Sequence, residues 1–203
     1  VVARMALREQ VTAVAFSPDG RLLAVAVAKR VQVWGVPTAA ERTALMAFTS
    51  VMTMSGHAER INSVEWSPCG RYVLTSGDDM LARVYTIALH SDKKHISPIQ
   101  LQGVHKHSVV AAFFSADGSR ILTVGKDSAA FEWRFDPVKG KLVTRPGEAV
   151  QHLLTLERDP ELPASDQTKT FRPWISDCRY NGELGMLIVG YQNGSFALFK
   201  QGL

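Results

Sequence analysis

The chain has 203 residues, of which 46% are hydrophobic, and it carries a formal net charge of +4 with an isoelectric point near 9.2. No apolar run reaches the roughly eighteen residues that would predict a membrane span, and the N-terminal stretch VVARMALREQ is too short and too interrupted by charges to be a signal peptide. The mild positive charge permits an anionic partner such as RNA without requiring one. Because the chain does not start with Met, we expect it to be a fragment of a longer protein.

Four copies of one pattern follow each other along the chain. Each copy is an apolar run, a polar turn, a second apolar run, a turn of small residues, and an alternating run that ends in an aromatic residue. The copies cover residues 11–36, 61–87, 109–135 and 175–201. In each copy two aromatic residues lie 18 or 19 positions apart: Phe16 and Trp34, Trp66 and Tyr85, Phe114 and Trp133, Tyr180 and Phe199. Such a repeat of short strands is typical of the blades of a β-propeller.

The polar turn has its own signature. It reads FSPDGR at 16–21, WSPCGR at 66–71 and FSADGS at 114–119. Proline at the second turn position presets φ near −65°, and glycine at the fourth accepts a positive φ at little cost. The turn therefore predicts a tight connection between two strands in each copy.

A long interval, residues 136–174, separates the third copy from the fourth. Within it, RPGEAVQHLLTLER (145–158) places apolar residues near helical spacing and predicts either a helix or a strand followed by a loop. The whole chain thus predicts an all-β fold of about four blades, each a four-stranded antiparallel sheet, forming one partial propeller over 1–203. An open arc of four blades would expose a sheet face at each end. We therefore expect either further chain or neighbouring molecules to cover those faces.

Residues around the second and third copies resemble the tryptophan–aspartate (WD) repeat family, whose propellers usually have seven blades. The second copy has Gly56-His57 and Asp79, six residues before Tyr85; the third has Asp127, six before Trp133. The resemblance implies two buried structural tetrads: His57, Thr75, Asp79 and Tyr85 in the second copy, and His105, Thr123, Asp127 and Trp133 in the third. Such a tetrad satisfies its buried polar atoms internally.

The first and fourth copies depart from this pattern. The first has Ala28 at the position of the aspartate and no upstream histidine, and the fourth has Asn193 there and Phe199 in place of tryptophan. We expect these two blades to depend mainly on packing.

A finer resemblance covers about three-quarters of the chain. The stretches FSPDGRLLAVAVAKRVQVWGVP, VVAAFFSADGSRILTVGKDSAAFEWRF and LIVGYQNGSFALFK are similar to the first propeller of the periodic tryptophan protein two family. The match fails over 136–174, where that family carries a variable, often acidic insert. The resemblance implies a scaffold in the nucleolus, within a UtpB-type complex of the small-subunit processome. Its partners would be other protein subunits and the pre-ribosomal RNA or small nucleolar RNP, with no cofactor, membrane or small-molecule substrate.

The histidines and the known catalytic motifs decide whether a metal site or a catalytic site is expected. His90, His95, His105, His107 and His152 lack a completing ligand set at a familiar spacing, so no metal site is expected. No nucleophile elbow, phosphate loop or dinucleotide fingerprint occurs, and we expect no catalytic activity. An enzyme would need a polar cluster in the central channel without a structural task.

Cysteine and serine positions in the turns have structural explanations too. Cys69 and Cys178 match no metal or disulfide pattern, which favours a reducing compartment. Cys69 replaces the aspartate of the turn, and an inert surface thiol is favoured over a reactive one because nothing nearby clearly lowers its pKa. Ser17-Pro18 and Ser67-Pro68 resemble phosphorylation motifs, but the turn itself requires these residues.

The basic loop residues are a solvated surface or, alternatively, contacts to RNA or partners. The candidates for such contacts are Lys93, Lys94, Lys106, Lys139 and Lys141. No aromatic-and-basic stacking platform is apparent, so base-specific readout is not expected. The alternative function is a WD-repeat scaffold of another complex, such as a ubiquitin-ligase substrate receptor or a trafficking coat.

Overall fold

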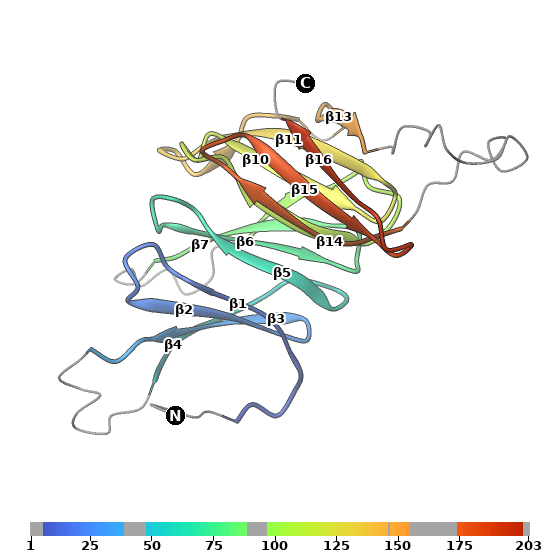
Figure 1. Cartoon of the computed structure of the whole chain (residues 1–203). Coiled ribbons are helices and arrows are strands. Elements are labelled where there is room, and N and C mark those ends of the chain that lie inside the picture. Colours follow the sequence, from blue (N-terminus) through green and yellow to red (C-terminus); the bar gives the residue numbers. More distant parts are fainter. Residues whose placement is uncertain (1–5, 39–47, 89–96, 146, 155–173, 201–203) are drawn as a thin grey trace, which may run out of the picture.

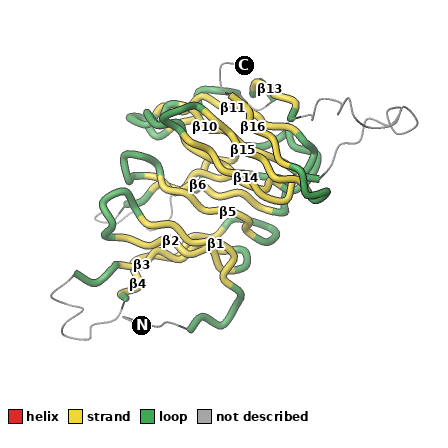
Figure 2. Tube along the Cα trace, viewed as in Figure 1, coloured by secondary structure: helices red, strands yellow, loops and turns green. Residues whose placement is uncertain are grey.

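The computed structural model describes residues 6–38, 48–88, 97–145, 147–154 and 174–200. These residues form β-strands joined by turns, and none of them lies in an α-helix (Figure 2). The helix alternative for 145–158 is therefore wrong where the segment is described, because Val150–Leu153 forms strand β13. None of the described residues forms a helix long and apolar enough to cross a membrane.

Two four-stranded antiparallel sheets come first. The strands of the first are β1 (Val11–Phe16), β2 (Leu22–Val27), β3 (Arg30–Gly35) and β4 (Thr49–Ser55), paired in that order. The strands of the second are β5 (Ile61–Trp66), β6 (Tyr72–Gly77), β7 (Ala82–Thr86) and β8 (Ile99–Leu101). In both sheets the inner three strands come from one sequence copy, and the outer strand comes from the segment that follows it.

The third sheet is built in the same way from β9 (Val109–Phe114), β10 (Arg120–Gly125) and β11 (Ala129–Asp136). Its outer edge has two strands, because β13 pairs with the first half of β11 and the short β12 (Lys141–Leu142) pairs with its end. The described part of the fourth sheet has three strands, β14 (Ile175–Asn181), β15 (Met186–Tyr191) and β16 (Phe196–Lys200). The predicted all-β class, a segment of a β-propeller, is confirmed.

The four sheets follow one another in chain order, from the blue first sheet through the cyan and green second to the yellow third and red fourth (Figure 1). Neighbouring sheets pack face to face, and their innermost strands β1, β5, β9 and β14 lie next to one another. This succession of inner strands is the geometry of propeller blades around a common axis.

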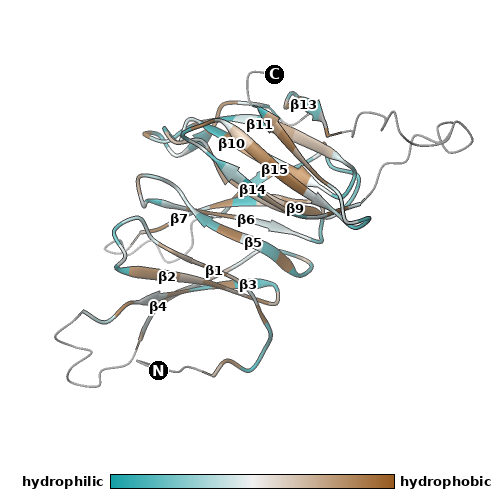
Figure 3. Cartoon of the chain, in the orientation of Figure 1, coloured by the Kyte–Doolittle hydropathy of each residue, from teal (hydrophilic) through white to brown (hydrophobic). Residues whose placement is uncertain are grey.

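Each junction between two sheets holds its own apolar core, and strands such as β2 and β15 are brown over much of their length in Figure 3. Between the first and second sheets, Trp66 and Tyr85 pack against small residues such as Ala24 and Ala26. The second junction is centred on Trp133, which is completely buried. The third contains Phe113, Leu187 and other apolar side chains. Because large rings from one sheet fill space above small residues on the preceding one, each blade is positioned by its neighbour.

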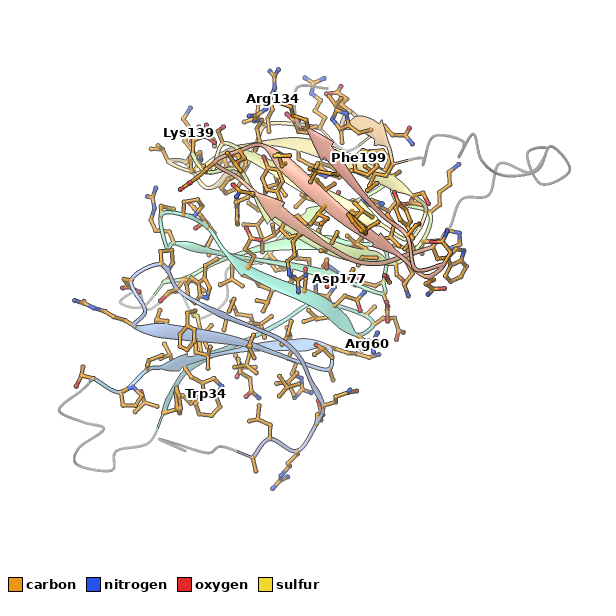
Figure 4. The ribbon with its side chains drawn as sticks, viewed as in Figure 1. Trp34, Arg60, Arg134, Lys139, Asp177 and Phe199 are labelled. Atoms are coloured by element: carbon orange, nitrogen blue, oxygen red, sulfur yellow. The ribbon has the colours of Figure 1, made fainter. Side chains whose placement is uncertain are left out.

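The two end sheets each present an apolar face to solvent. On β1 of the first sheet, Val14 is 60% and Phe16 62% exposed, whereas Trp66 and Phe114 at the matching positions are 5% and 4% exposed. Trp34 lies on the side of the first sheet away from the second (Figure 4). On the fourth sheet, Phe196 and Leu198 are also exposed. No other described residues complete a blade against these faces.

Candidate interaction surfaces and buried tetrads

The structure brings together the side chains of the tetrad expected in the second copy. His57 Nδ1 donates to the Asp79 carboxylate at 2.9 Å, and its Nε2 lies 2.7 Å from the Thr75 hydroxyl. Asp79 also accepts the backbone N–H of Ala58 at 3.0 Å. Burial lowers the pKa of His57 despite the adjacent carboxylate, so the ring is neutral near pH 7 and Nε2 accepts the proton of Thr75. The three side chains therefore tie the loop before β5 to β6 and to the turn that follows it.

The tetrad of the third copy is a longer chain of hydrogen bonds. His105 Nδ1 donates to Asp127 at 3.2 Å, and its Nε2 lies 2.9 Å from Thr123 Oγ1. Trp133 Nε1 donates to the same Thr123 oxygen at 3.0 Å, which leaves the hydroxyl proton free to point at His105. Burial raises the pKa of Asp127, but the hydrogen bonds from His105 and the Lys106 N–H outweigh it and lower the pKa. All four members are therefore connected.

Tyr85 does not reproduce the part that Trp133 plays. Its buried hydroxyl has no hydrogen-bond partner among the described residues, and burial raises the pKa of Tyr85 to about 12. Next to it, the buried Arg83 lies where the third copy has Phe131, and its NH2 donates to Asp79 at 3.2 Å. The Nε and NH1 atoms of Arg83 have no partner among the described residues. The second blade therefore contains three orphaned polar atoms that the third avoids, each of which costs free energy.

The first and fourth copies lack the tetrad, and the structure shows why in the first. Val25 pairs with Gln32, seven residues later, whereas Thr123 pairs with Phe131, eight residues later. The β2–β3 turn is thus one residue shorter than the β10–β11 turn. The first copy therefore has no position equivalent to Asp127, and the expectation that Ala28 occupies it is wrong. Ala28 instead adopts a φ of 50° and its carbonyl accepts the N–H of Ile61 at 2.8 Å. In the fourth copy Asn193 closes its own turn by accepting from Ser195.

The repeated polar turns are held by their serines. Ser17 Oγ donates to Asp19 at 2.6 Å and accepts the N–H of Leu22 at 2.9 Å. Ser17 and Ser67 are 5% and 1% exposed, which supports the turn role over phosphorylation at the two Ser-Pro motifs. Their hydroxyls are inaccessible in the folded blade.

Contrary to the expectation from the sequence, two neighbours of Cys69 affect the pKa of its thiol. Burial alone would raise the pKa of Cys69, but its hydrogen bond with Ser67, at 3.4 Å, and the adjacent Arg71 together lower it. The exposed Cys69 is therefore a better nucleophile than the sequence indicates, whereas burial raises the pKa of Cys178 to about 12.

The basic candidates lie in different places. Lys139 is exposed on the turn before β12, 3.8 Å from Asp136, and Lys141 is exposed on β12. Lys139 and Arg60 lie on opposite sides of the molecule (Figure 4). Lys106 is exposed beside the third tetrad. Lys93 and Lys94 lie outside the described residues, as do His90 and His95.

One hollow brings a basic and an aromatic group together, which the sequence did not reveal. It has a volume of about 320 Å³ and includes Lys106, His107, Lys126, Phe131, Gln151 and Trp174 in its walls. We call it the Trp174 hollow. Trp174 follows the long interval and Lys126 lies in the β10–β11 turn, so no sequence motif links them.

The acidic and histidine side chains in the described part of the chain do not gather into a metal centre. Within the described ranges, no group of three or more His, Cys, Asp or Glu residues could hold a metal ion. His57, Asp79, His105 and Asp127 are occupied by the tetrads, which is a structural role. What the geometry offers is surface: loops, hollows and end faces positioned by rigid sheets.

Comparison with known proteins agrees with this architecture. The family model described as "WD domain, G-beta repeat" matches residues 5–35 and 48–86, which include the first two sets of inner strands. The chain thus contains WD40 repeats. Because WD40 propellers act as scaffolds for protein interactions, the solvent-facing loops and faces are its candidate functional surfaces.

Similarity to individual WD40 proteins extends over most of the chain. It is 28% identical over 195 residues to the periodic tryptophan protein 2 homolog of Schizosaccharomyces pombe, covering 95% of the chain and 22% of that relative. It is 36% identical over 128 residues to periodic tryptophan protein 2 of Saccharomyces cerevisiae, covering 63% of the chain and 14% of the relative. Human coronin-7 is 32% identical over 127 residues, or 61% of the chain and 13% of the relative. The chain thus spans about a fifth of the curated relatives that it matches along most of its length.

Proposed function

We propose that this WD40 chain is a non-catalytic scaffold of the small-subunit processome, which acts in pre-ribosomal RNA processing and 40S assembly in the nucleolus. The observation that carries the proposal is the similarity to a periodic tryptophan protein 2 homolog along 95% of the chain, because it includes the interval between the third and fourth copies as well as the repeats. Its partners would be protein subunits of a UtpB-type complex and the pre-ribosomal RNA.

The geometry supports a scaffold rather than an enzyme. Rigid blades hold their loops in fixed positions, and the buried polar clusters of the described residues serve the blades themselves. The exposed faces and loops are therefore the parts of the molecule that can bind partners, as is usual for residues on loops of a rigid scaffold.

The test is affinity purification of the tagged full-length protein, followed by identification of the bound proteins and RNA. We expect processome subunits, pre-ribosomal RNA and a nucleolar location of the tagged protein. A second WD40 protein with the same tag serves as the matched control for non-specific capture. If neither processome subunits nor pre-ribosomal RNA were enriched over this control, the proposal would be wrong.

A second candidate is a WD40 scaffold in another complex, such as a ubiquitin-ligase receptor or a trafficking coat. The similarity to human coronin-7 favours it, because the chain is 32% identical to that protein, which has a different name from the periodic tryptophan protein 2 relatives. Recovery of ligase or coat subunits in the same purification would select this candidate.

A further inference from the structure

The Trp174 hollow has walls from four separate parts of the chain. They are the loop 104–107 before β9, the turn 126–128 with the start of β11, Gln151 on β13, and Trp174 next to β14. The buried Phe131 contributes an apolar wall. Its volume, about 320 Å³, lies at the lower end of the range of ligand sites in proteins.

The backbone fixes these walls before any ligand arrives. The carbonyl of Trp174 accepts the N–H of Gln192 at 2.9 Å, which anchors it to the β15–β16 turn. The N–H of Lys126 donates to the Ser108 carbonyl at 3.0 Å, and the N–H of Lys106 donates to Asp127 at 2.9 Å. A preformed site loses less entropy on binding than one that must order its loops.

The aromatic part of the hollow is open to solvent. Trp174 is 54% exposed, and the exposed His107 lies beside it with a ring-centroid distance of 6.1 Å and an interplanar angle of 39°. An exposed indole next to an imidazole offers a stacking surface for another planar ring. Stacking on aromatic side chains is the main sequence-tolerant interaction of single-stranded nucleic acids with proteins.

The charged part of the hollow favours an anion. Lys106 is exposed and Lys126 half-buried, and both contribute to the walls. Among the described residues that line the hollow, Asp127 supplies the carboxylate, and it is already bonded to His105 and to the Lys106 N–H. Asp78 lies close enough to Lys126 to interact with it electrostatically, so Lys106 is the stronger of the two cations toward a ligand.

We propose that the Trp174 hollow binds single-stranded nucleic acid, with one base on Trp174 and His107 and the adjoining phosphates at Lys106 and Lys126. The combination of an exposed indole with two ammonium groups around one hollow favours this ligand over an apolar peptide, which offers no anionic group to Lys106. The inference deepens the proposed function and rests on it only for the source of the strand, pre-ribosomal RNA.

The test measures binding of short fluorescent oligonucleotides to the full-length protein by anisotropy, at several salt concentrations. Trp174→Ala should weaken binding of a single-stranded oligouridylate by about 5-fold to 150-fold, the range expected for one lost stacking contact. Lys106→Ala with Lys126→Ala should lower the steepness of log K against log salt by about 1.4, because about 0.7 of a counterion is released per phosphate contact. Trp174→Phe should keep most of the affinity.

The controls separate this site from general basic binding. Arg21→Ala with Lys200→Ala removes the same charge at exposed positions outside the hollow, in the β1–β2 turn and at the end of β16, and should change binding little. Oligodeoxyuridylate, duplex RNA and an acidic peptide form the other arms. Comparable affinity for the DNA oligonucleotide would identify a general single-strand site, whereas preferred binding of the peptide would overturn the proposal.

Two outcomes keep this proposal distinct from the proposed function. If the protein bound RNA but Trp174→Ala did not weaken it, the site would be wrong and the processome role would stand. If it bound no single strand at all, the site would also be wrong, while the processome role would still be judged by the subunits that co-purify. Circular dichroism melts of each variant exclude loss of folding as the cause.

Discussion

At the scale of single residues, the two tetrads show which of their hydrogen bonds the spacing of the repeat predicts and which it does not. Spacing alone locates His57 with Asp79 and His105 with Asp127, because the repeat fixes both positions relative to the aromatic anchors. Spacing does not show that the Tyr85 hydroxyl lacks a partner among the described residues. That depends on whether the side chain brings its polar atom to the threonine, as Trp133 does in the third copy. Spacing also does not show that Arg83 is buried, because an arginine in an alternating strand can lie on either face of the sheet.

The tetrad difference leads to a stability prediction. Thr75→Val removes the partner of His57 Nε2 and should lower the free energy of unfolding by about 1–3 kcal/mol, the cost of one orphaned buried group. Thr123→Val orphans both His105 and Trp133, and should cost about 1–3 kcal/mol more. Urea unfolding of both variants measures the difference. Tyr85→Phe is the control and should not lower the free energy of unfolding, because it removes a buried hydroxyl that has no hydrogen-bond partner among the described residues. Equal losses for both threonine variants would contradict this expectation.

At the scale of elements, the inner strands depend on side chains from the preceding blade. The Glu65 carboxylate accepts the N–H of Phe114 at 2.9 Å, and Asn62 Nδ2 donates to the Val109 carbonyl at 3.0 Å. In the other direction, Trp66 Nε1 donates to the Ala15 carbonyl at 3.0 Å. These bonds satisfy edge groups of β9 and β1 that would otherwise be free to pair with another strand. The sequence repeat predicts the strands but not these contacts, since they join different copies.

Glu65 makes one of these contacts dependent on pH. Burial raises the pKa of Glu65 to about 7, so its protonated form is favoured in the folded state. Stability from this group is fully present below its ordinary pKa near 4.5 and is lost as the pH rises through about 7. Glu65→Gln keeps an oxygen for Phe114 without the charge. It should therefore be more stable than the wild type at pH 8, by up to about 3 kcal/mol, and similar to it at pH 4.

Urea unfolding between pH 4 and 8 measures this difference. Glu183→Gln is the matched control, because it replaces a carboxylate that is exposed to solvent by the same amide. A Glu65→Gln curve that runs parallel to the wild type over the whole pH range would refute the assignment.

At the scale of the whole molecule, the sequence predicted the class and the succession of blades, because the aromatic anchors recur with nearly constant spacing. It could not predict the Trp174 hollow, since Lys106, Lys126 and Trp174 come together only when the third and fourth sheets pack. It left 145–158 open between helix and strand; β13 forms because β11 offers an unpaired edge, which is a tertiary influence that local spacing does not contain.

The described sheets form an open arc, and we expect its two exposed apolar end faces to be covered by a neighbour. Light scattering coupled to size-exclusion chromatography, on the 203-residue chain over a range of concentrations, tests it most directly. We predict self-association that grows with concentration and is reduced by Phe16→Ser with Phe196→Ser, because these exposed rings lie on the two end faces. A compact monomer at every concentration, unaffected by the double substitution, would contradict the claim.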